Sequence, residues 1–296
     1  MTLADTQSHL VQKLLDNAQS EETITPENVY QIGNNVNREI IKTLIDQLML
    51  PGSTINGFEN MQELYKRSKN GESCLLLVEH YSNFDIPAIY QVLEQEKELG
   101  KEIADSIISI AGMKLSVDNP VVSAFAEAYT RIVIYPSRSL KQFEGTAEYD
   151  DEQKLSSTIN RAALYSMIKA KHHGHIILVF PAGTRYREND PSTKRGLPEM
   201  DSYLKSFDHV LFLGIAGNLL KVTEEMHNDK LNPDVVVLQA SPVLKAKAFR
   251  SNARETAEKN GASDVKQAAA DAIMAKLEEM HNLAEKTRQE ILQKMA

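Results

Sequence analysis

The stretch that decides the fold is residues 74–85, CLLLVEHYSNFD, in which an apolar run is followed by a histidine and, five positions later, by an aspartate. A short uninterrupted apolar run is typical of a strand buried on both faces. His80 and Asp85 therefore stand at the exit of a predicted strand, where α/β enzymes place their chemistry. A histidine accepts a proton near neutral pH, and a carboxylate can orient its ring and stabilise the imidazolium. Asp85 also has a structural alternative, as the N-cap of the helix that follows.

A second segment repeats this arrangement. The apolar run HIILV at residues 175–179 is followed by FPAGTRYR at residues 180–187. Two strand exits with complementary chemistry predict a single site between them.

Basic residues gather locally in a chain whose formal net charge is −8. The overall acidity argues against a surface that coats nucleic acid, since duplex binding normally needs a basic face. The local clusters are Arg131, Arg138 and Lys141, and then Arg185, Arg187, Lys194 and Arg195. They indicate a small anionic ligand, and the alternative is an ordinary solvated charged face.

Predicted helices and strands alternate from about residue 58 onward, which is the pattern of βαβ units and a largely parallel sheet. The predicted strands are 74–79, 106–111, 131–135, 175–180, 210–215 and 234–239. The predicted helices are 58–69, 86–98, 119–128, 152–171 and a long C-terminal helix from Val265 to Lys294. Residues 251–264 have the composition of a polar connector. The sequence predicts an α/β fold with a mostly parallel mixed sheet flanked by helices.

The first 57 residues differ from the rest in being predicted as helical only. Thr25 can cap a helix that starts with Pro26, and apolar residues then recur at helical spacing until Pro51-Gly52. An earlier helix is predicted around Leu10. We therefore divide the chain into an N-terminal helical segment, 1–57, and an α/β domain, 58–296.

Composition is that of an ordinary globular chain, with 296 residues, 42% hydrophobic and 25% charged. The single Cys74 excludes an intrachain disulfide and suits a reducing compartment. The N-terminus lacks the basic and apolar regions of a secretory signal, so a cytoplasmic location is expected. The apolar stretch 210–216 is far shorter than the roughly 20 residues that cross a bilayer, which leaves only peripheral membrane contact.

Several common catalytic motifs are absent from the sequence, namely G-x-S-x-G, the Walker loop, G-x-G-x-x-G and H-E-x-x-H. The cluster His172-His173-Gly174-His175 could suggest a metal site. Adjacent side chains at a helix end point in different directions, however, and positive groups there complement the exposed carbonyls. We therefore expect no metal.

The H-x4-D pair, the basic segment IVIYPSR at residues 132–138 and FPAGTR at residues 180–185, in this order, resemble the glycerolipid acyltransferase family. The soluble plastid-type glycerol-3-phosphate acyltransferases are the most similar members. They share the absence of a membrane span, a helical segment before the α/β domain, and the sequence RYR followed by DPST at residues 190–193. The resemblance covers about residues 60 to 245.

This resemblance implies transfer of a fatty acyl group to the 1-hydroxyl of glycerol 3-phosphate. The donor is a thioester of acyl carrier protein or coenzyme A, which acts as co-substrate, and no other cofactor is implied. Attack is expected to be direct, without an acyl-enzyme, and with backbone N–H groups stabilising the oxyanion. The location is then cytoplasmic, or the plastid stroma if the chain is the mature form of a plastid protein. The implied roles are general base for His80, its partner for Asp85, phosphate binding for Arg138, Arg185 and Arg187, and a supporting turn for Gly183 and Thr184.

Two departures from the family pattern bear on the alternatives. Many membrane-bound relatives have Glu where this chain has Ala182, which weakens a second hypothesis, acylation of a lysophospholipid. Ser139 stands where the soluble type often places another basic residue. A third hypothesis, a non-catalytic module that binds lipid or an acyl carrier, is disfavoured by the intact His80 and Asp85 pair. The sequence leaves open the acyl-chain length, the choice of donor and the oligomeric state.

Overall fold

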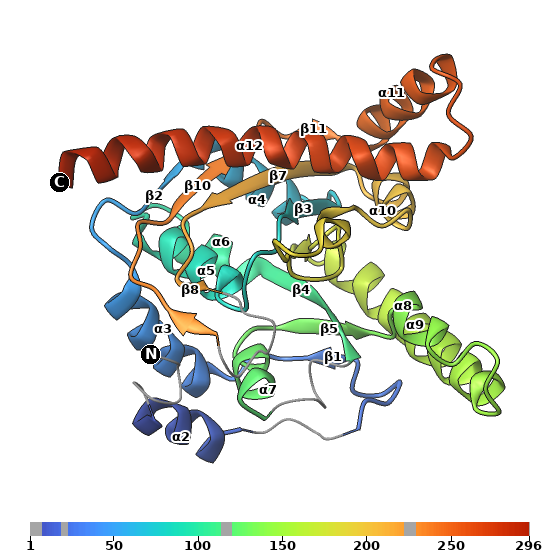
Figure 1. The fold of residues 1–296 in the computed structure, drawn as a ribbon, viewed down its shortest axis with the longest axis horizontal. Helices are drawn as coiled ribbons and strands as arrows, with labels where there is room; N and C mark the ends of the chain where they lie inside the picture. Colours follow the sequence, from blue (N-terminus) through green and yellow to red (C-terminus); the bar gives the residue numbers. More distant parts are fainter. Residues whose placement is uncertain (1–7, 19–22, 114–119, 222–228, 296) are drawn as a thin grey trace.

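A computed structural model describes residues 8–18, 23–113, 120–221 and 229–295 of the chain. Within these ranges the strands form one nine-stranded mixed sheet and a separate two-stranded sheet, and helices cover both faces of the large sheet (Figure 1). The predicted fold class, an α/β fold with a mostly parallel sheet flanked by helices, is confirmed.

The centre of the large sheet is parallel. Its strands, in spatial order, are β5 (Arg131–Ile134), β4 (Ile107–Gly112), β6 (Ile176–Val179), β3 (Cys74–Val78) and β7 (His209–Ala216). Every residue of β3, β6 and β7 is buried, because helices pack on both faces. This double burial explains why β3 and β6 are uninterrupted apolar runs in the sequence and why β7 is apolar after His209.

The edges of the sheet are mixed. Strand β10 (Val237–Ala240) runs antiparallel to β7 and parallel to β2 (Thr54–Asn56), while β11 (Leu244–Lys245) pairs antiparallel with the start of β7. At the other edge β1 (Tyr30–Gln31) is antiparallel to β5. The small second sheet pairs β8 (Leu220–Lys221) with β9 (Lys230–Leu231).

The N-terminal segment contains the helices α2 (Ser8–Asp16) and α3 (Asn35–Leu48), but it also supplies β1 and β2, one to each end of the large sheet. The prediction that a helix starts at Pro26 is wrong. The helix starts at Asn35, because the Asn34 side chain accepts hydrogen bonds from the backbone N–H groups of Val36 and Asn37, while the chain before it pairs with β5.

The two faces of the sheet carry separate apolar cores. Helices on one face, besides α3, are α4 (Phe58–Lys69), α5 (Asp85–Gln95), α6 (Gly100–Ser106) and α7 (Pro120–Glu127). Helices on the other are α9 (Tyr149–Lys171), α10 (Met200–Ser206), α11 (Ala246–Lys259) and α12 (Val265–Met295). Two short helices lie in connections, α8 (Ser137–Lys141) and the 3-10 helix η2 (Pro191–Lys194). In Figure 1, α12 runs alongside β7 and β10.

Two predicted segments need correction. The connector predicted at 251–264 is largely the helix α11, which is anchored by bonds from Arg250 and Arg254 to the buried Asp201. The single helix predicted at 86–98 is α5 alone, and a second helix, α6, follows it before β4. The start of the helix predicted at 119–128 lies outside the described residues, and α7 covers 120–127.

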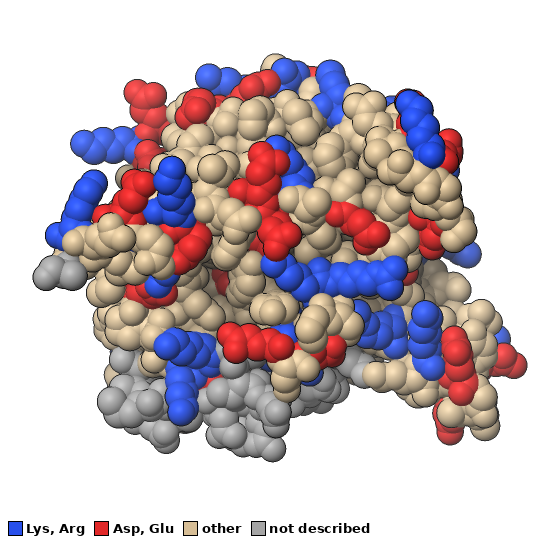
Figure 2. Space-filling view, turned by 45° about the horizontal axis from the view of Figure 1, so that its top comes forward, with Lys and Arg blue, Asp and Glu red and all other residues tan. Residues whose placement is uncertain are grey.

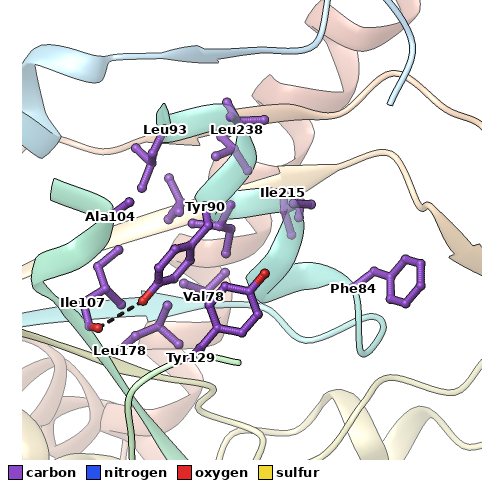
Figure 3. Packing of buried hydrophobic residues seen from close by; sticks show 14 of the residues in the cluster. Val78, Phe84, Tyr90, Leu93, Ala104, Ile107, Tyr129, Leu178, Ile215 and Leu238 are labelled. Carbon is purple, nitrogen blue, oxygen red and sulfur yellow. Dashed lines mark hydrogen bonds between the residues drawn. The ribbon is translucent and has the colours of Figure 1, made fainter. Parts of the chain in front are cut away.

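Helix α5 is fixed on the sheet by Tyr90 and Leu93, which pack among apolar side chains of several strands (Figure 3). The Tyr90 hydroxyl donates a hydrogen bond to the carbonyl of Ile107 over 3.1 Å. The first turn of α5 directly follows the exit of β3, so this packing also holds the segment that carries His80 and Asp85.

Acidic and basic side chains are interspersed among uncharged residues on the surface displayed in Figure 2. No helix among the described residues combines the length and the apolar character that a bilayer crossing requires.

Candidate functional site

The exits of β3 and β6 are neighbours, because these strands pair in parallel with Leu77 opposite Val179. Parallel pairing brings their carboxyl ends to the same edge of the sheet. The two exit segments are also bonded to each other, since the Tyr186 N–H donates to the His80 carbonyl over 2.7 Å. The structure thus brings together the two segments that the sequence predicted to share a site.

His80 and Asp85 are in direct contact, with 2.8 Å between His80 Nδ1 and Asp85 Oδ2. The His80 side chain is 19% exposed, whereas the Asp85 carboxylate is buried. When Nδ1 carries the proton that Asp85 accepts, the imidazole is left with Nε2 as its proton acceptor. This is the geometry of a general base with an orienting carboxylate.

The Asp85 carboxylate is itself held in place by the loop before it. Oδ2 accepts hydrogen bonds from the backbone N–H groups of Tyr81 (2.6 Å) and Ser82 (3.0 Å), and Oδ1 accepts one from the Ser82 hydroxyl (3.2 Å). Asp85 is the first residue of α5 and Phe84 takes the N-cap position, so the structural alternative of an N-cap is wrong. The carboxylate is directed back toward His80 rather than along the helix.

The His80 ring is also fixed by stacking. It lies on the Phe180 ring with 4.0 Å between the centroids and an angle of 12° between the planes. Phe180 was not among the predicted site residues, although it immediately follows β6. Stacking and the bond to Asp85 together restrict the ring to one orientation.

A cavity of about 880 Å³ opens at this edge of the sheet, and His80 lines it. Arg138, Gly183, Thr184, Arg185 and Arg187, all predicted site residues, line the same cavity. Its apolar lining comes from both faces of the sheet and includes Ile110, Phe125, Ile134, Leu164 and Met167. Basic groups and an apolar surface therefore meet beside one histidine.

The three arginines differ in their surroundings. Arg185 is buried, and its Nη1 donates to Asp229 Oδ2 over 3.0 Å. Arg138 and Arg187 are exposed, and neither forms an ion pair with any other described residue. Asp229 was not predicted, and it lies 44 positions from Arg185 with no motif around it. The two exposed arginines are thus the better placed to bind an anion, and Arg185 is partly committed to Asp229.

The turn after β6 requires its glycine. Gly183 has a φ of 63°, in the left-handed region, and its N–H donates to the Phe180 carbonyl over 2.9 Å. A Cβ added at this position would lie 2.7 Å from Leu197 Cδ1. Gly183 therefore sets the path of the chain into Thr184 and the arginines.

Neither alternative nucleophile is suited to attack. Cys74 is buried at the start of β3, where burial raises the pKa of its thiol to about 12. The Ser82 hydroxyl is engaged, since it donates to Asp85 and accepts from the Phe84 N–H.

The histidine cluster at residues 172–175 does not converge on one point. The Nδ1 atoms of His172, His173 and His175 lie near three different backbone carbonyls, so the rings diverge.

The fold and the site define an α/β protein with a His–Asp pair beside a cavity that is part basic and part apolar. A scan against protein-family models finds no match, and a search of curated proteins finds no significant relative. The likeness to glycerolipid acyltransferases therefore rests on the motifs and their order.

Proposed function

We propose that the protein is an acyltransferase that transfers a fatty acyl group from acyl-acyl carrier protein or acyl-coenzyme A to the 1-hydroxyl of glycerol 3-phosphate. The observation that carries this proposal is that a carboxylate-bound histidine and two exposed arginines line one cavity with apolar walls. Each part matches one part of the reaction: a base for a hydroxyl, cations for a phosphate and an apolar surface for an acyl chain.

Arg138 and Arg187 would bind the acceptor phosphate, because guanidinium groups form bidentate hydrogen bonds with phosphate oxygens. A phosphate held there keeps the acceptor in the cavity with its hydroxyl near His80. The cavity volume of about 880 Å³ is within the range of about 300–1,000 Å³ that is typical of small-molecule sites.

In the proposed reaction the acceptor oxygen attacks the thioester carbonyl while His80 takes the hydroxyl proton. The carbon–oxygen bond forms, and the carbonyl oxygen carries the negative charge of the tetrahedral intermediate. Collapse of this intermediate breaks the carbon–sulfur bond, and the leaving thiolate receives the proton from the His80 imidazolium. Asp85 stabilises that imidazolium and stays ionised.

The test separates phosphate binding from chemistry. Arg187→Ala should raise the KM for glycerol 3-phosphate by about tenfold to a hundredfold with little change in kcat, because a hydrogen bond to a charged group contributes about 1.5–3 kcal/mol. Arg195→Ala is the matched control, since Arg195 is exposed but does not line the cavity. His80→Ala should instead lower kcat by about 10²–10⁴-fold.

Two outcomes would count against the proposal. An unchanged KM in both Arg138→Ala and Arg187→Ala would remove the phosphate site from this cavity. A kcat/KM higher with 1-acyl-glycerol 3-phosphate than with glycerol 3-phosphate, for the same donor, would identify a lysophospholipid acyltransferase. We expect glycerol 3-phosphate to be preferred by at least about tenfold, or 1.4 kcal/mol in transition-state binding.

A further inference from the structure

One face of α9 exposes large apolar side chains that none of the described elements covers. Leu164, Tyr165 and Ile168 are adjacent on this helix and are 49%, 72% and 44% exposed. The opposite face of α9, with Ile159 and Met167, packs on the sheet. An isolated exposed apolar residue needs no explanation, but three neighbours on one helix form a patch that indicates an interaction.

The charged residues next to this patch along α9 are basic, although the whole chain is acidic. No Asp or Glu occurs between Glu152 and Glu188. Arg161 and Lys169 are exposed within one turn or so of the apolar patch, and neither forms an ion pair with a described residue. Apolar side chains of α9 are therefore flanked by two cations that form no ion pair with a described residue.

The position of the patch connects it to the site. Helix α9 projects from the body of the molecule beyond the edge of the sheet (Figure 1). Leu164 belongs to the patch and also lines the cavity that holds His80. The exposed apolar surface is thus continuous with the cavity wall.

We propose that this face of α9 docks the protein on an anionic lipid surface. The exposed face of α9 shares one combination with helices that lie in the membrane interface, namely aromatic and aliphatic side chains flanked by Lys and Arg. The inference rests on the proposed function in one respect: the acylated product is an amphiphile, and a bilayer against the cavity mouth could receive it.

The experiment is co-sedimentation of the full chain with phosphatidylcholine vesicles, with and without phosphatidylglycerol, and with no substrate present. The wild type should bind the vesicles that contain phosphatidylglycerol, and added salt should weaken this binding. The double variant Tyr165→Ser/Ile168→Ser should lower the partition coefficient at least about tenfold, because it removes two apolar contacts with the lipid. Arg161→Glu should lower it as well.

Leu283→Ser is the matched control, since Leu283 lies on α12 and is 45% exposed, close to the value for Ile168. It should bind vesicles as the wild type does. Circular dichroism would show that the variants, all at exposed positions, remain folded.

Two results would overturn docking on lipid: a wild type that stays in the supernatant at low salt, or a double variant that binds vesicles as the wild type does. If that double variant also lost turnover with acyl carrier protein only, the patch would be assigned to a protein partner. Because binding is measured without substrate, a protein that binds vesicles but transfers no acyl group would refute the proposed function and leave the docking face in place.

Discussion

Replacing Asp85 by Asn tests the site with the smallest change in shape. The amide oxygen can accept the hydrogen bonds that Oδ2 now accepts from His80 Nδ1 and from the N–H groups of Tyr81 and Ser82. What the variant loses is the negative charge beside the imidazolium that forms when His80 takes a proton.

The size of this loss follows from the geometry. His80 Nδ1 and Asp85 Oδ2 are 2.8 Å apart, so the centres of the two charges are about 4 Å apart. Two unit charges at about 4 Å interact by about 4 kcal/mol at an effective dielectric constant of about 20. Since about 1.4 kcal/mol is a tenfold change in rate, Asp85→Asn should lower kcat by about 10³-fold. Its cost in stability should be about 1–3 kcal/mol, because hydrogen bonds to a charged group become neutral ones.

The assay is kcat at saturating donor and acceptor, together with the free energy of unfolding from a denaturant titration. Asp201→Asn is the control, because Asp201 is an equally buried carboxylate that binds Arg250 and does not line the cavity. It should lose stability and keep its kcat. If Asp85→Asn retained kcat within about threefold of the wild type, Asp85 would have no part in stabilising a protonated His80.

Arg38→Ala should destabilise the fold by about 1–3 kcal/mol at neutral pH, because Arg38 forms an ion pair with the largely shielded carboxylate of Glu94. Burial opposes ionisation of Glu94, but hydrogen bonds from Lys42 and Arg38 outweigh it and lower its pKa. The stabilisation by ionised Glu94 is therefore fully present above the pKa of about 4.3 that a glutamate has in the unfolded chain, and it is lost as the pH falls through the lower pKa of Glu94 in the folded protein. The wild type and Arg38→Ala should therefore converge in stability at acid pH. Burial raises the pKa of the Cys74 thiol to about 12, so Cys74 should react with a maleimide only in denaturant. Rapid labelling of the native protein would contradict its burial. Gly183→Ala should cost about 1–2 kcal/mol in unfolding free energy because of its positive φ, and an unchanged stability would show that the turn adapts.

The sequence was most informative where local pattern and tertiary packing agree. The helix predicted at 58–69 and the strands that begin at Cys74 and near Ile176 match the structure closely, because double burial leaves a continuous apolar run. The start of α3 was missed because its cap is Asn34, while Thr25 lies in a segment that leads to β1. Pairing with a distant strand overrode the local helix signal there.

In the site too, contacts between residues close in the sequence could be predicted, and contacts between distant residues could not. His80 and Asp85 are five residues apart, so their contact needs only a tight loop, and the sequence indicated it directly. The ion pair of Arg185 with Asp229 joins residues far apart in the chain, and no spacing rule indicates it. Stacking of Phe180 on His80 follows from the pairing of two strands, which the sequence predicts only as neighbours in a sheet.

The bond between the Tyr186 N–H and the His80 carbonyl has a consequence for how this site can change. Apart from Gly183, side chains on the two exit segments can be exchanged one at a time without moving the backbone, because the backbone bond and the parallel register do not depend on them. A change in length is different: one residue inserted in β6 would advance the chain by about 3.3 Å and turn the following side chains to the other face. The Phe180 ring, which stacks on His80, and the arginines that follow it would then be displaced together. The backbone frame of the site is therefore less sensitive to most substitutions than to insertion or deletion.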